Sequence, residues 1–388
     1  MSLPRPYLQA SSLVERWLGE FSPSTLHGYH VIDWDVDHGL SLTLGCGDDH
    51  VLIELSARDE GSSCLTRTER FNVTARARFA TDPNLSQTQL IVVDAVLHAL
   101  RRMETTFPPI DRPTVDTAHS RKLSLRAVGV DRALTREGLG QYYLNPYVGC
   151  SIGCSYCFVE HQADLARALE GEPWRPWGRW VDIKRNLPAV LAREVRELTP
   201  GIVRMSPIVT DPYQPIEGRE RITRQCLKLM LPAGFSPCVL TRAARLAEDI
   251  PLLTRFEKAW VGVSIPTDDD EVRRAFEPLA DPIAARLDLL QKCKRAGLRT
   301  FAVIQPILPH DTNRLVDALA PLIEVVRIDG LHLGNRVRSI YEQLGRTDAM
   351  SDGWFQERSA ALADAFRAQG VRLHELEDLR DLFEQRRC

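Results

Sequence analysis

The chain has 388 residues and a mass of 43.8 kDa, enough for two domains and a large core. Apolar residues make up 44% and charged residues 26%, as in an ordinary soluble globular protein. No apolar run is long enough to span a bilayer, and the first residues lack the basic and apolar regions of a secretion signal. We therefore expect a cytoplasmic protein without membrane contact, in which the nine cysteines stay reduced.

The charge is spread unevenly along the chain. Residues 1–118 contain 10 Lys or Arg and 16 Asp or Glu, a balance of −6, whereas the remainder has a balance of +3. A nucleic-acid clamp needs clustered positive charge against phosphates. The acidic N-terminal part therefore disfavours nucleic acid as a partner.

Residues 1–118 predict a small α+β domain, a candidate for recognition of substrate or a partner. A proline-rich stretch at 107–113 is typical of a stiff linker, so we place the domain boundary there. The predicted elements are helices at 13–21 and 86–103 and strands at 30–34, 40–44 and 51–55.

From residue 119 to 345, strand-like and helix-like segments alternate. Six β-then-α units imply a parallel sheet, which right-handed crossovers would curl into a partial (βα)6 TIM-type barrel with its function at the carboxyl ends of the strands. A C-terminal helical extension, 346–388, should cover an edge. The predicted strands are 142–148, 202–209, 237–240, 259–265, 298–304 and 325–331, and the helices are 187–198, 223–230, 243–256, 283–296, 354–369 and 376–387.

Three cysteines form the most informative motif of the chain. Cys150, Cys154 and Cys157 have the spacing C-x-x-x-C-x-x-C directly after the first of these strands. Three thiolates can hold a cubane iron–sulfur cluster and leave its fourth iron free to bind a small molecule and pass it an electron. The alternative is a structural zinc site, which needs a fourth ligand, and His161 is the nearest candidate.

The segment from Leu144 to Phe158, with an aromatic residue just before the third cysteine, resembles the radical S-adenosylmethionine (SAM) superfamily. Within it the chain is most similar to the spore photoproduct lyase-like branch. The resemblance covers roughly residues 120–345 and does not include the first 118. Segments that match in order are 181–186, 210–215, Thr241-Arg242, 261–265 and 276–278.

The resemblance implies a [4Fe-4S] cluster on Cys150, Cys154 and Cys157, with SAM chelating the fourth iron. An electron from the reduced cluster would split SAM into methionine and a 5′-deoxyadenosyl radical, which abstracts hydrogen from an unreactive carbon. The partners implied are a peptide or small-molecule substrate and an electron donor such as flavodoxin or ferredoxin.

The resemblance also implies SAM contacts at the strand ends. Thr210 and Asp211 stand where the superfamily holds the SAM amino group. The alternative is a purely structural role in a stiff turn. Arg242 replaces the usual Lys and supplies positive charge for the SAM carboxylate. Ser264 is placed to bind ribose or carboxylate, and Gln305 faces the same mouth.

Three further features have two interpretations each. Tyr156 either leans against adenine or packs in the core. Glu277 and Arg286 either grip SAM or pair with each other as exposed charges. The Trp- and Arg-rich stretch 174–180 either stacks on substrate or packs its Trp side chains onto the barrel.

We therefore expect a radical SAM enzyme that acts on a peptide or a small metabolite. The alternative is a DNA-lesion repair lyase of the spore photoproduct lyase type, which supplies a hydrogen-donating cysteine near the end of the second strand. Here residues 206–210 contain no cysteine, nor does any position between Cys157 and Cys226. A non-catalytic cluster or zinc protein would leave the later motifs unexplained.

Overall fold

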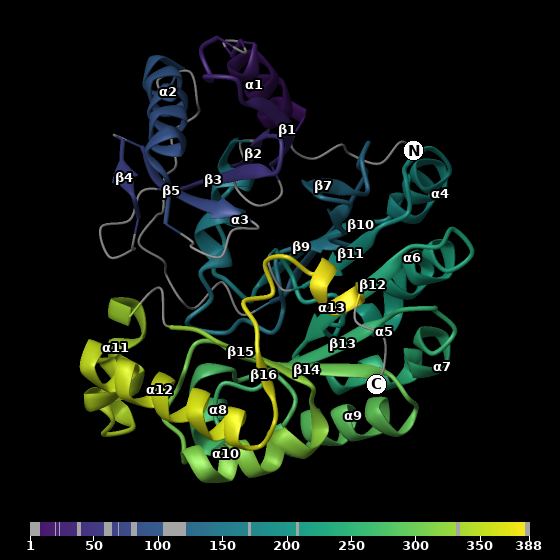
Figure 1. Cartoon of the computed structure of the whole chain (residues 1–388), viewed down its shortest axis with the longest axis vertical. Coiled ribbons are helices and arrows are strands. Elements are labelled where there is room, and N and C mark those ends of the chain that lie inside the picture. The colour runs from purple at the N-terminus through teal and green to yellow at the C-terminus, as the bar shows by residue number, and fades with distance from the viewer. Residues whose placement is uncertain are drawn as a thin grey trace.

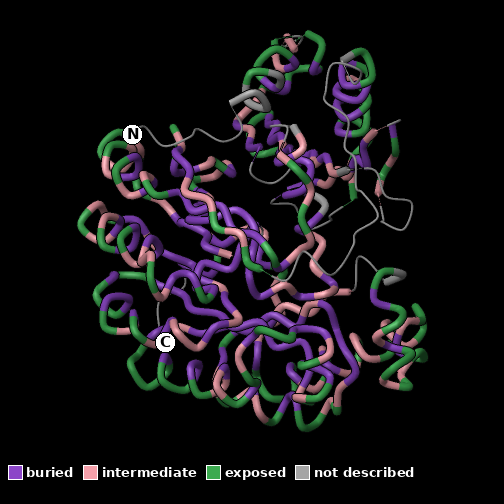
Figure 2. The backbone as a smooth tube through the Cα atoms, turned by 180° about the vertical axis from the view of Figure 1, so that it is seen from behind, coloured by how far each residue is buried: buried purple, intermediate pink, exposed green. Residues whose placement is uncertain are grey.

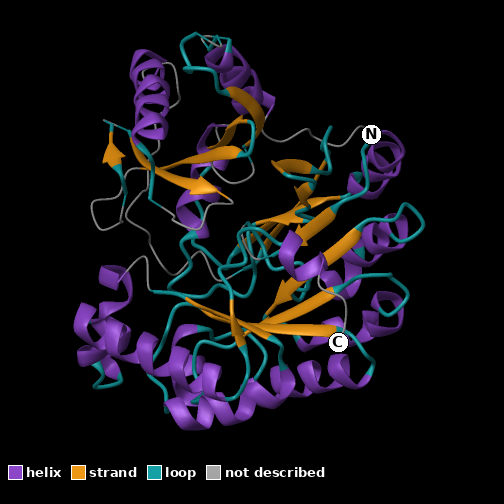
Figure 3. Ribbon diagram, viewed as in Figure 1, coloured by secondary structure: helices purple, strands orange, loops and turns teal. Residues whose placement is uncertain are grey.

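The computed structural model describes residues 8–19, 21–22, 24–36, 40–57, 64–68, 70–78, 84–103, 122–169, 172–206, 209–330 and 334–384. These residues form three β-sheets with helices around them (Figures 1 and 3). The predicted linker at 107–113 and the domain boundary after residue 118 lie outside the described residues. Among the described helices, none combines the length and the apolarity needed to cross a bilayer.

The N-terminal sheet has five antiparallel strands in the order β1-β2-β3-β5-β4. Two helices, α1 (Leu8–Leu18) and α2 (Gln87–Met103), cover one face of it (Figure 1). The three predicted strands and the helix 86–103 are confirmed, the first helix spans Leu8–Leu18 and not 13–21, and β4 and β5 are additional. The strands are β1 (His30–Asp35), β2 (Leu40–Cys46), β3 (Asp49–Ala57), β4 (Thr66–Arg67) and β5 (Phe71–Arg78).

The core of this sheet extends into the chain beyond the predicted boundary. Leu42, Ile53 and Val73 pack in one cluster with Ala163 and Leu165 of helix α3 (Val159–Leu169), all nearly fully buried. The N-terminal sheet therefore shares its apolar core with the helix that follows the three cysteines.

The predicted strand 142–148 is wrong as a single element. It divides into β8 (Gln141–Tyr143), which joins the large sheet, and β9 (Tyr147–Val148), which joins a small sheet with β6 (Ser124–Val128) and β10 (Trp180–Lys184). Pro146 lies between the two parts, and a proline offers no N–H to a neighbouring strand. The chain therefore changes sheets at this proline, immediately before the cysteine loop.

The large sheet has eight strands in the order β16-β15-β14-β13-β12-β11-β8-β7. All neighbours are parallel except the hairpin of β7 (Thr135–Gly138) with β8, so the predicted parallel α/β order is confirmed. The hydrogen-bonded order of the described strands ends at β16 and β7. The remaining strands are β11 (Ile202–Met205), β12 (Ser236–Thr241), β13 (Trp260–Ser264), β14 (Arg299–Ile304), β15 (Val325–Ile328) and β16 (Arg372–Leu373).

The connecting helices mostly lie where the periodicity predicts them. The predicted helix 243–256 is wrong, because η2 (Ala244–Asp249) is a 3₁₀ helix and only α7 (Ile250–Leu253) is α-helical. Pro251 in the first turn of α7 explains the break, since proline is favoured at a helix start and not inside one. The α-helices of this region also include α4 (Leu187–Glu197), α5 (Glu217–Glu220), α6 (Ile222–Met230), α8 (Asp270–Phe276), α9 (Ile283–Arg295), α10 (Thr312–Leu319), α11 (Arg338–Gln343) and α12 (Asp352–Ala368).

Both faces of the parallel sheet are buried, as Figure 2 shows by the buried strands inside a more exposed ring of helices. One face packs under the outer helices through residues such as Val239 and Val261. The other face, which includes Trp260 and Phe301, is covered by Leu382 and its neighbours near α13 (Arg380–Glu384). The predicted C-terminal helix 376–387 is therefore shorter than expected, Arg380–Glu384, and it packs against this face of the sheet.

A buried ionic cluster joins the N-terminal sheet to the parallel sheet. Glu137 of β7 accepts hydrogen bonds from Arg78 of β5 and, at 3.2 Å, from Nε of Arg204 of β11. Their side chains are 1%, 1% and 8% exposed. Burial alone would raise the pKa of Glu137, but Arg204 and Arg78 lower it below its usual value.

Replacing Glu137 by Ala should destabilise the protein by about 3–5 kcal/mol, because the buried Arg204 loses its carboxylate and the buried Arg78 keeps only Glu377, at 3.6 Å. Chemical denaturation followed by circular dichroism measures the change. Asp364→Ala is the control, since that carboxylate is 80% exposed and should contribute nothing measurable. Equal stability of the two variants would contradict the structural role of the cluster.

Candidate active site

The three cysteines lie on one loop and line one pocket. The loop follows β9 and precedes α3, and the pocket encloses about 740 Å³, part of it open to solvent. Cys150 and Cys154 are buried and Cys157 is partly buried. Of the predicted site residues, the pocket is also lined by Tyr156, Thr210, Asp211, Arg242, Ser264 and Gln305.

Two glycines allow the loop to wrap closely against the chain around it. Gly149 has φ +79°, and a Cβ there would lie 2.7 Å from the ring and the carbonyl oxygen of Trp180. Gly153 has φ +62°, and its Cβ would lie 3.0 Å from Cα of Gly178. Only glycine combines this backbone conformation with such close approach. The position of the thiols therefore depends on these glycines.

Two side chains after β11 hold the start of the loop. The hydroxyl of Thr210 donates to the carbonyl of Gly149 at 2.7 Å. Gln214 donates to the same carbonyl at 3.1 Å, and its Oε1 accepts from the backbone N–H of Ser151 at 2.8 Å. The hydroxyl of Thr210 is thus directed at the cysteine loop. Gln214 was not among the predicted site residues, although it lies in the segment 210–215 that resembles the radical SAM superfamily.

Asp211 is 1% exposed and is occupied by neighbouring donors. Its carboxylate accepts from the backbone N–H groups of Tyr213 at 2.9 Å and Arg242 at 2.7 Å, and from the Thr241 hydroxyl at 2.6 Å. Burial raises the pKa of Asp211, and these three hydrogen bonds oppose that rise. The contacts favour the turn role and tie the end of β11 to the end of β12.

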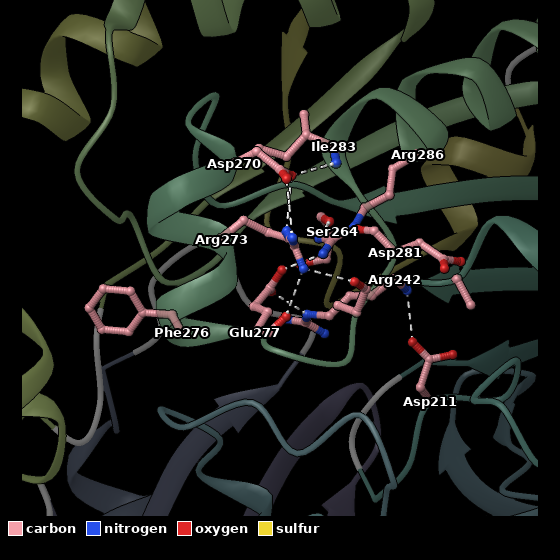
Figure 4. A network of polar contacts seen from close by, with 12 residues as sticks. Asp211, Arg242, Ser264, Asp270, Arg273, Phe276, Glu277, Asp281, Ile283 and Arg286 are labelled. Carbon is pink, nitrogen blue, oxygen red and sulfur yellow. Dashed lines mark hydrogen bonds and ion pairs between the residues drawn. The ribbon is translucent and has the colours of Figure 1, made fainter.

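A second carboxylate, Glu277, lies at the centre of the network in Figure 4. It is fully buried and accepts from Nε of Arg242 at 2.8 Å, from Nη2 of Arg286 at 2.5 Å and from the hydroxyl of Tyr156. Burial would raise the pKa of Glu277, but Arg286 and Arg242 lower it. The carboxylate therefore stays charged and fixes both guanidinium groups.

Glu277 and Arg286 do not line the pocket; they lie behind its wall. Arg286, itself 0% exposed, also donates to the backbone carbonyls of Ser264 at 2.8 Å and Asp281 at 2.8 Å. The two residues do pair, but as buried charges and not as the exposed pair that the alternative interpretation supposed. Their contacts position Arg242 and the end of β13, both of which reach the pocket.

The hydroxyl of Tyr156 is engaged by Glu277 and lies 3.3 Å from Nη2 of Arg242. Its ring packs near Phe276, with ring centroids 6.4 Å apart. The ring also lines the pocket, so core packing and pocket lining coincide at this residue.

Ser264 and Gln305 reach the pocket from β13 and from just beyond β14. The Ser264 hydroxyl oxygen is buried and has no hydrogen-bond partner among the described residues. The amide of Gln305 donates to Asp329 at 2.9 Å. A buried hydroxyl without a partner is unfavourable, so the site offers Ser264 to a polar ligand group in the pocket.

The Trp- and Arg-rich stretch 174–180 packs mainly against the protein. Trp180 is 1% exposed in β10, and Arg167 lies over its ring at 4.3 Å. Trp174 donates to Asp164 at 3.0 Å. Trp177 packs edge-on against Trp180 and lines the pocket beside the cysteines, so it is the one tryptophan of this stretch that reaches the site.

The residues present fit an iron–sulfur cluster and SAM. Burial raises the pKa of Cys150, Cys154 and Cys157 to about 12, so iron binding would displace their protons. Among the described side chains, no group of three or more His, Cys, Asp or Glu is arranged to hold a single metal ion. In a cubane each thiolate binds a different iron, and one shared ion is not required. The side chain of His161 lies outside the described residues.

Three cysteines, the partly buried Arg242 and the hydroxyl of Ser264 meet at the carboxyl edge of the parallel sheet and define a candidate cluster and cofactor pocket in an α/β fold. Residues 144–320 match the family model of the radical SAM superfamily. This part of the chain is therefore a radical SAM domain, and a domain of this superfamily indicates an enzyme.

The curated relatives are uncharacterised proteins. One, from Methanocaldococcus jannaschii, is 27% identical over 195 residues, which are 50% of this chain and 71% of that protein. Another, from Mycobacterium tuberculosis H37Rv, is 30% identical over 211 residues, which are 51% of this chain and 61% of that protein. The chain thus spans about three fifths of the mycobacterial relative.

Two solved structures are also similar. A spore photoproduct lyase mutant bound to a dinucleoside spore photoproduct has a TM-score of 0.46 and 16% identity, covering 64% of this chain and 81% of that chain. Streptococcus suis SuiB bound to its precursor peptide SuiA has a TM-score of 0.36 and 12% identity, covering 68% of this chain and 52% of that chain.

Replacing Gly149 by Ala should sharply reduce the iron bound after anaerobic reconstitution, because the new methyl group meets the Trp180 ring and carbonyl and displaces the loop. Gly140→Ala is a matched control: φ there is +73°, but a Cβ would have nothing within 4 Å. Iron content and the visible absorption of the cluster measure the effect. Equal iron in the two variants would contradict the packing argument.

Proposed function

We propose that the protein cleaves SAM reductively at a [4Fe-4S] cluster and uses the radical so formed to abstract hydrogen from a peptide or small-metabolite substrate. The observation that carries the proposal is the meeting of Cys150, Cys154 and Cys157 with Arg242 and Ser264 in one pocket. The parallel strands that supply these residues would form the predicted partial barrel, with the site at their carboxyl ends.

The cluster, when bound, supplies one electron, and SAM supplies a 5′-deoxyadenosyl radical with methionine as the other product. The residues of this chain bind and orient the cofactors. The three cysteines are the metal ligands, and Arg242 would hold the SAM carboxylate through a guanidinium that Glu277 aligns from behind. The Ser264 hydroxyl would donate to the SAM carboxylate or exchange a hydrogen bond with a ribose hydroxyl. Gln305 would line the side of the pocket that faces the substrate.

The remaining predicted site residues take supporting roles in this proposal. Thr210 and Asp211 order the cysteine loop and the end of β12, so the SAM amino group would meet the backbone of this turn. The ring of Tyr156 lines the pocket next to Arg242, where it would pack against the bound SAM. Glu277 and Arg286 are positioning residues because they lie behind the pocket wall.

We also propose a cytoplasmic enzyme reduced by a donor such as flavodoxin or ferredoxin, with residues 1–118 as a recognition domain, 119–345 as the barrel and 346–388 as a C-terminal extension. The alternative function is DNA-lesion repair of the spore photoproduct lyase type. That function would need a further cysteine as hydrogen donor. Among the described residues that line the pocket, the cysteines are the three of the loop, so none is left for this role.

Anaerobic reconstitution tests the proposal. It should give about four irons per chain and, with SAM and dithionite, 5′-deoxyadenosine and methionine in equal amounts. A zinc-replete protein that takes up no iron and does not cleave SAM would overturn it.

Replacing Cys154 by Ala should abolish formation of 5′-deoxyadenosine, because one iron of the cluster loses its ligand. Cys293→Ala is the control, since Cys293 is a buried cysteine of α9 outside the pocket. Chromatography of the nucleoside products measures both. Full SAM cleavage by Cys154→Ala would show that the assigned ligands are wrong.

Replacing Arg242 by Gln should raise the KM for SAM roughly 10- to 100-fold, since a hydrogen-bonded charge pair with the SAM carboxylate would be lost. The KM of Arg242→Lys should lie between those of the wild type and Arg242→Gln, because lysine keeps the positive charge but lacks the planar guanidinium group. Arg274→Gln, at a side chain 62% exposed, is the control. An unchanged KM in Arg242→Gln would place the SAM carboxylate elsewhere.

A further inference from the structure

A second, larger cavity lies between the N-terminal sheet and the parallel sheet. It encloses about 1,890 Å³, part of it open to solvent, and is lined by β2, β3 and β5 on one side and by β8, β11, β14 and β15 on the other. Phe158, Leu240, Val303 and Gln305 line both this chamber and the cysteine pocket. The two spaces therefore share a wall, and a molecule in the chamber lies next to the candidate SAM site.

The face that the N-terminal sheet turns to the chamber is polar. Thr43 of β2, Glu54 of β3 and Arg76 and Arg78 of β5 line it, whereas the opposite face packs on α1 and α2. A sheet face that serves only to cover another layer is normally apolar. This polar face is suited to enclosing a polar ligand.

The chamber carries more positive than negative side chains. Five arginines line it, against the four carboxylates of Glu54, Glu137, Asp329 and Glu377. Glu377 shows the effect of these arginines: burial would raise its pKa, but Arg76 and its neighbouring guanidinium groups lower it to about 2. The arginines are Arg76, Arg78, Arg136, Arg204 and Arg327.

Two of these arginines retain unused donors at one end of the chamber. Nη1 of Arg76 and Nη1 of Arg327 approach the same oxygen, Oε1 of Glu377, at 3.3 and 4.0 Å, so their guanidinium groups are neighbours. The Nε atom of each is buried and has no hydrogen-bond partner among the described residues. On α3, the acceptor Oε1 of Gln162 is also buried and has no hydrogen-bond partner among the described residues. Buried donors and acceptors of this kind are normally satisfied by a ligand or by water.

We propose that this chamber is the substrate site and that it takes a small polar molecule bearing a carboxylate or phosphate group. Its anionic oxygens accept from Arg76 and Arg327, and a donor group on it faces Gln162. The carbon that loses hydrogen then lies at the wall shared with the cysteine pocket, near Leu240 and Val303. This inference rests on the proposed SAM-dependent function and assigns half of the substrate site to the N-terminal sheet.

The test is the binding of matched small probes to the reconstituted full-length protein with SAM, followed by titration calorimetry and saturation-transfer NMR. The probes are glutarate, glycerol 3-phosphate and the uncharged glutaramide. Glutarate or glycerol 3-phosphate should bind roughly tenfold or more tightly than glutaramide, because only they offer anionic oxygens. The stronger of the two identifies the anionic group as carboxylate or phosphate.

Arg76→Gln should weaken binding of the preferred anion about tenfold, and Arg327→Gln is a second variant with the same expectation. Arg367→Gln, on α12 and 62% exposed, is the control and should bind like the wild type. Arg76 has a side chain that is 42% exposed, so its variant should fold.

Three results would overturn the inference: no binding of either anion, equal binding of glutaramide, or unchanged binding in both arginine variants. Formation of 5′-deoxyadenosine is measured on the same preparations. If SAM is cleaved but no anion binds, the substrate inference alone fails. If anions bind as expected but SAM is not cleaved, the proposed function fails instead.

Discussion

The fully buried carboxylate of Glu277 is the interaction on which the candidate site depends. It accepts hydrogen bonds from the cysteine loop through Tyr156, from the end of β12 through Arg242, and from α9 through Arg286. Arg286 in turn holds the carbonyl of Ser264 at the end of β13. One charge thus fixes a loop, a helix and two strand ends relative to one another. A charge in this position is tolerated only because two guanidinium groups compensate for its loss of hydration.

The second contact between distant parts of the chain is the cluster of Arg78, Glu137 and Arg204. It joins β5 of the N-terminal sheet to β7 and β11 of the parallel sheet, while Ala163 and Leu165 of α3 continue the apolar core of the N-terminal sheet. The N-terminal sheet is therefore attached to the rest of the chain by a buried ionic cluster and by a shared apolar core. This arrangement gives a physical reason for the acidic N-terminal segment to accompany a radical SAM domain.

The sequence predicted the features that depend on local pattern. The spacing of Cys150, Cys154 and Cys157 identified the loop, and the apolar runs located the parallel strands from β11 to β15. Strand β5 was missed although its residues alternate between apolar and polar, the pattern of a strand with one face in a core. Its polar face carries Thr74, Arg76 and Arg78, which line the chamber. The two residues of β16 carry no periodicity at all.

At the site, the sequence pattern assigned residues to the correct strand ends but could not show which way their side chains point. Thr210 turns to the carbonyl of Gly149, and Glu277 and Arg286 lie one layer behind the pocket. Gln214 was invisible because its partners, Gly149 and Ser151, are backbone and hydroxyl groups some sixty residues away. Such contacts are decided by tertiary packing and have no spacing that a sequence pattern could show.

The central claim is that SAM binds at the cluster in the pocket lined by Arg242 and Ser264. Electron paramagnetic resonance of the reduced, reconstituted protein, recorded with and without SAM, tests it most directly. We predict a [4Fe-4S] signal that changes shape when SAM is added, because SAM ligates the free iron. A signal that is unaffected by saturating SAM, or the absence of any cluster signal, would contradict the account.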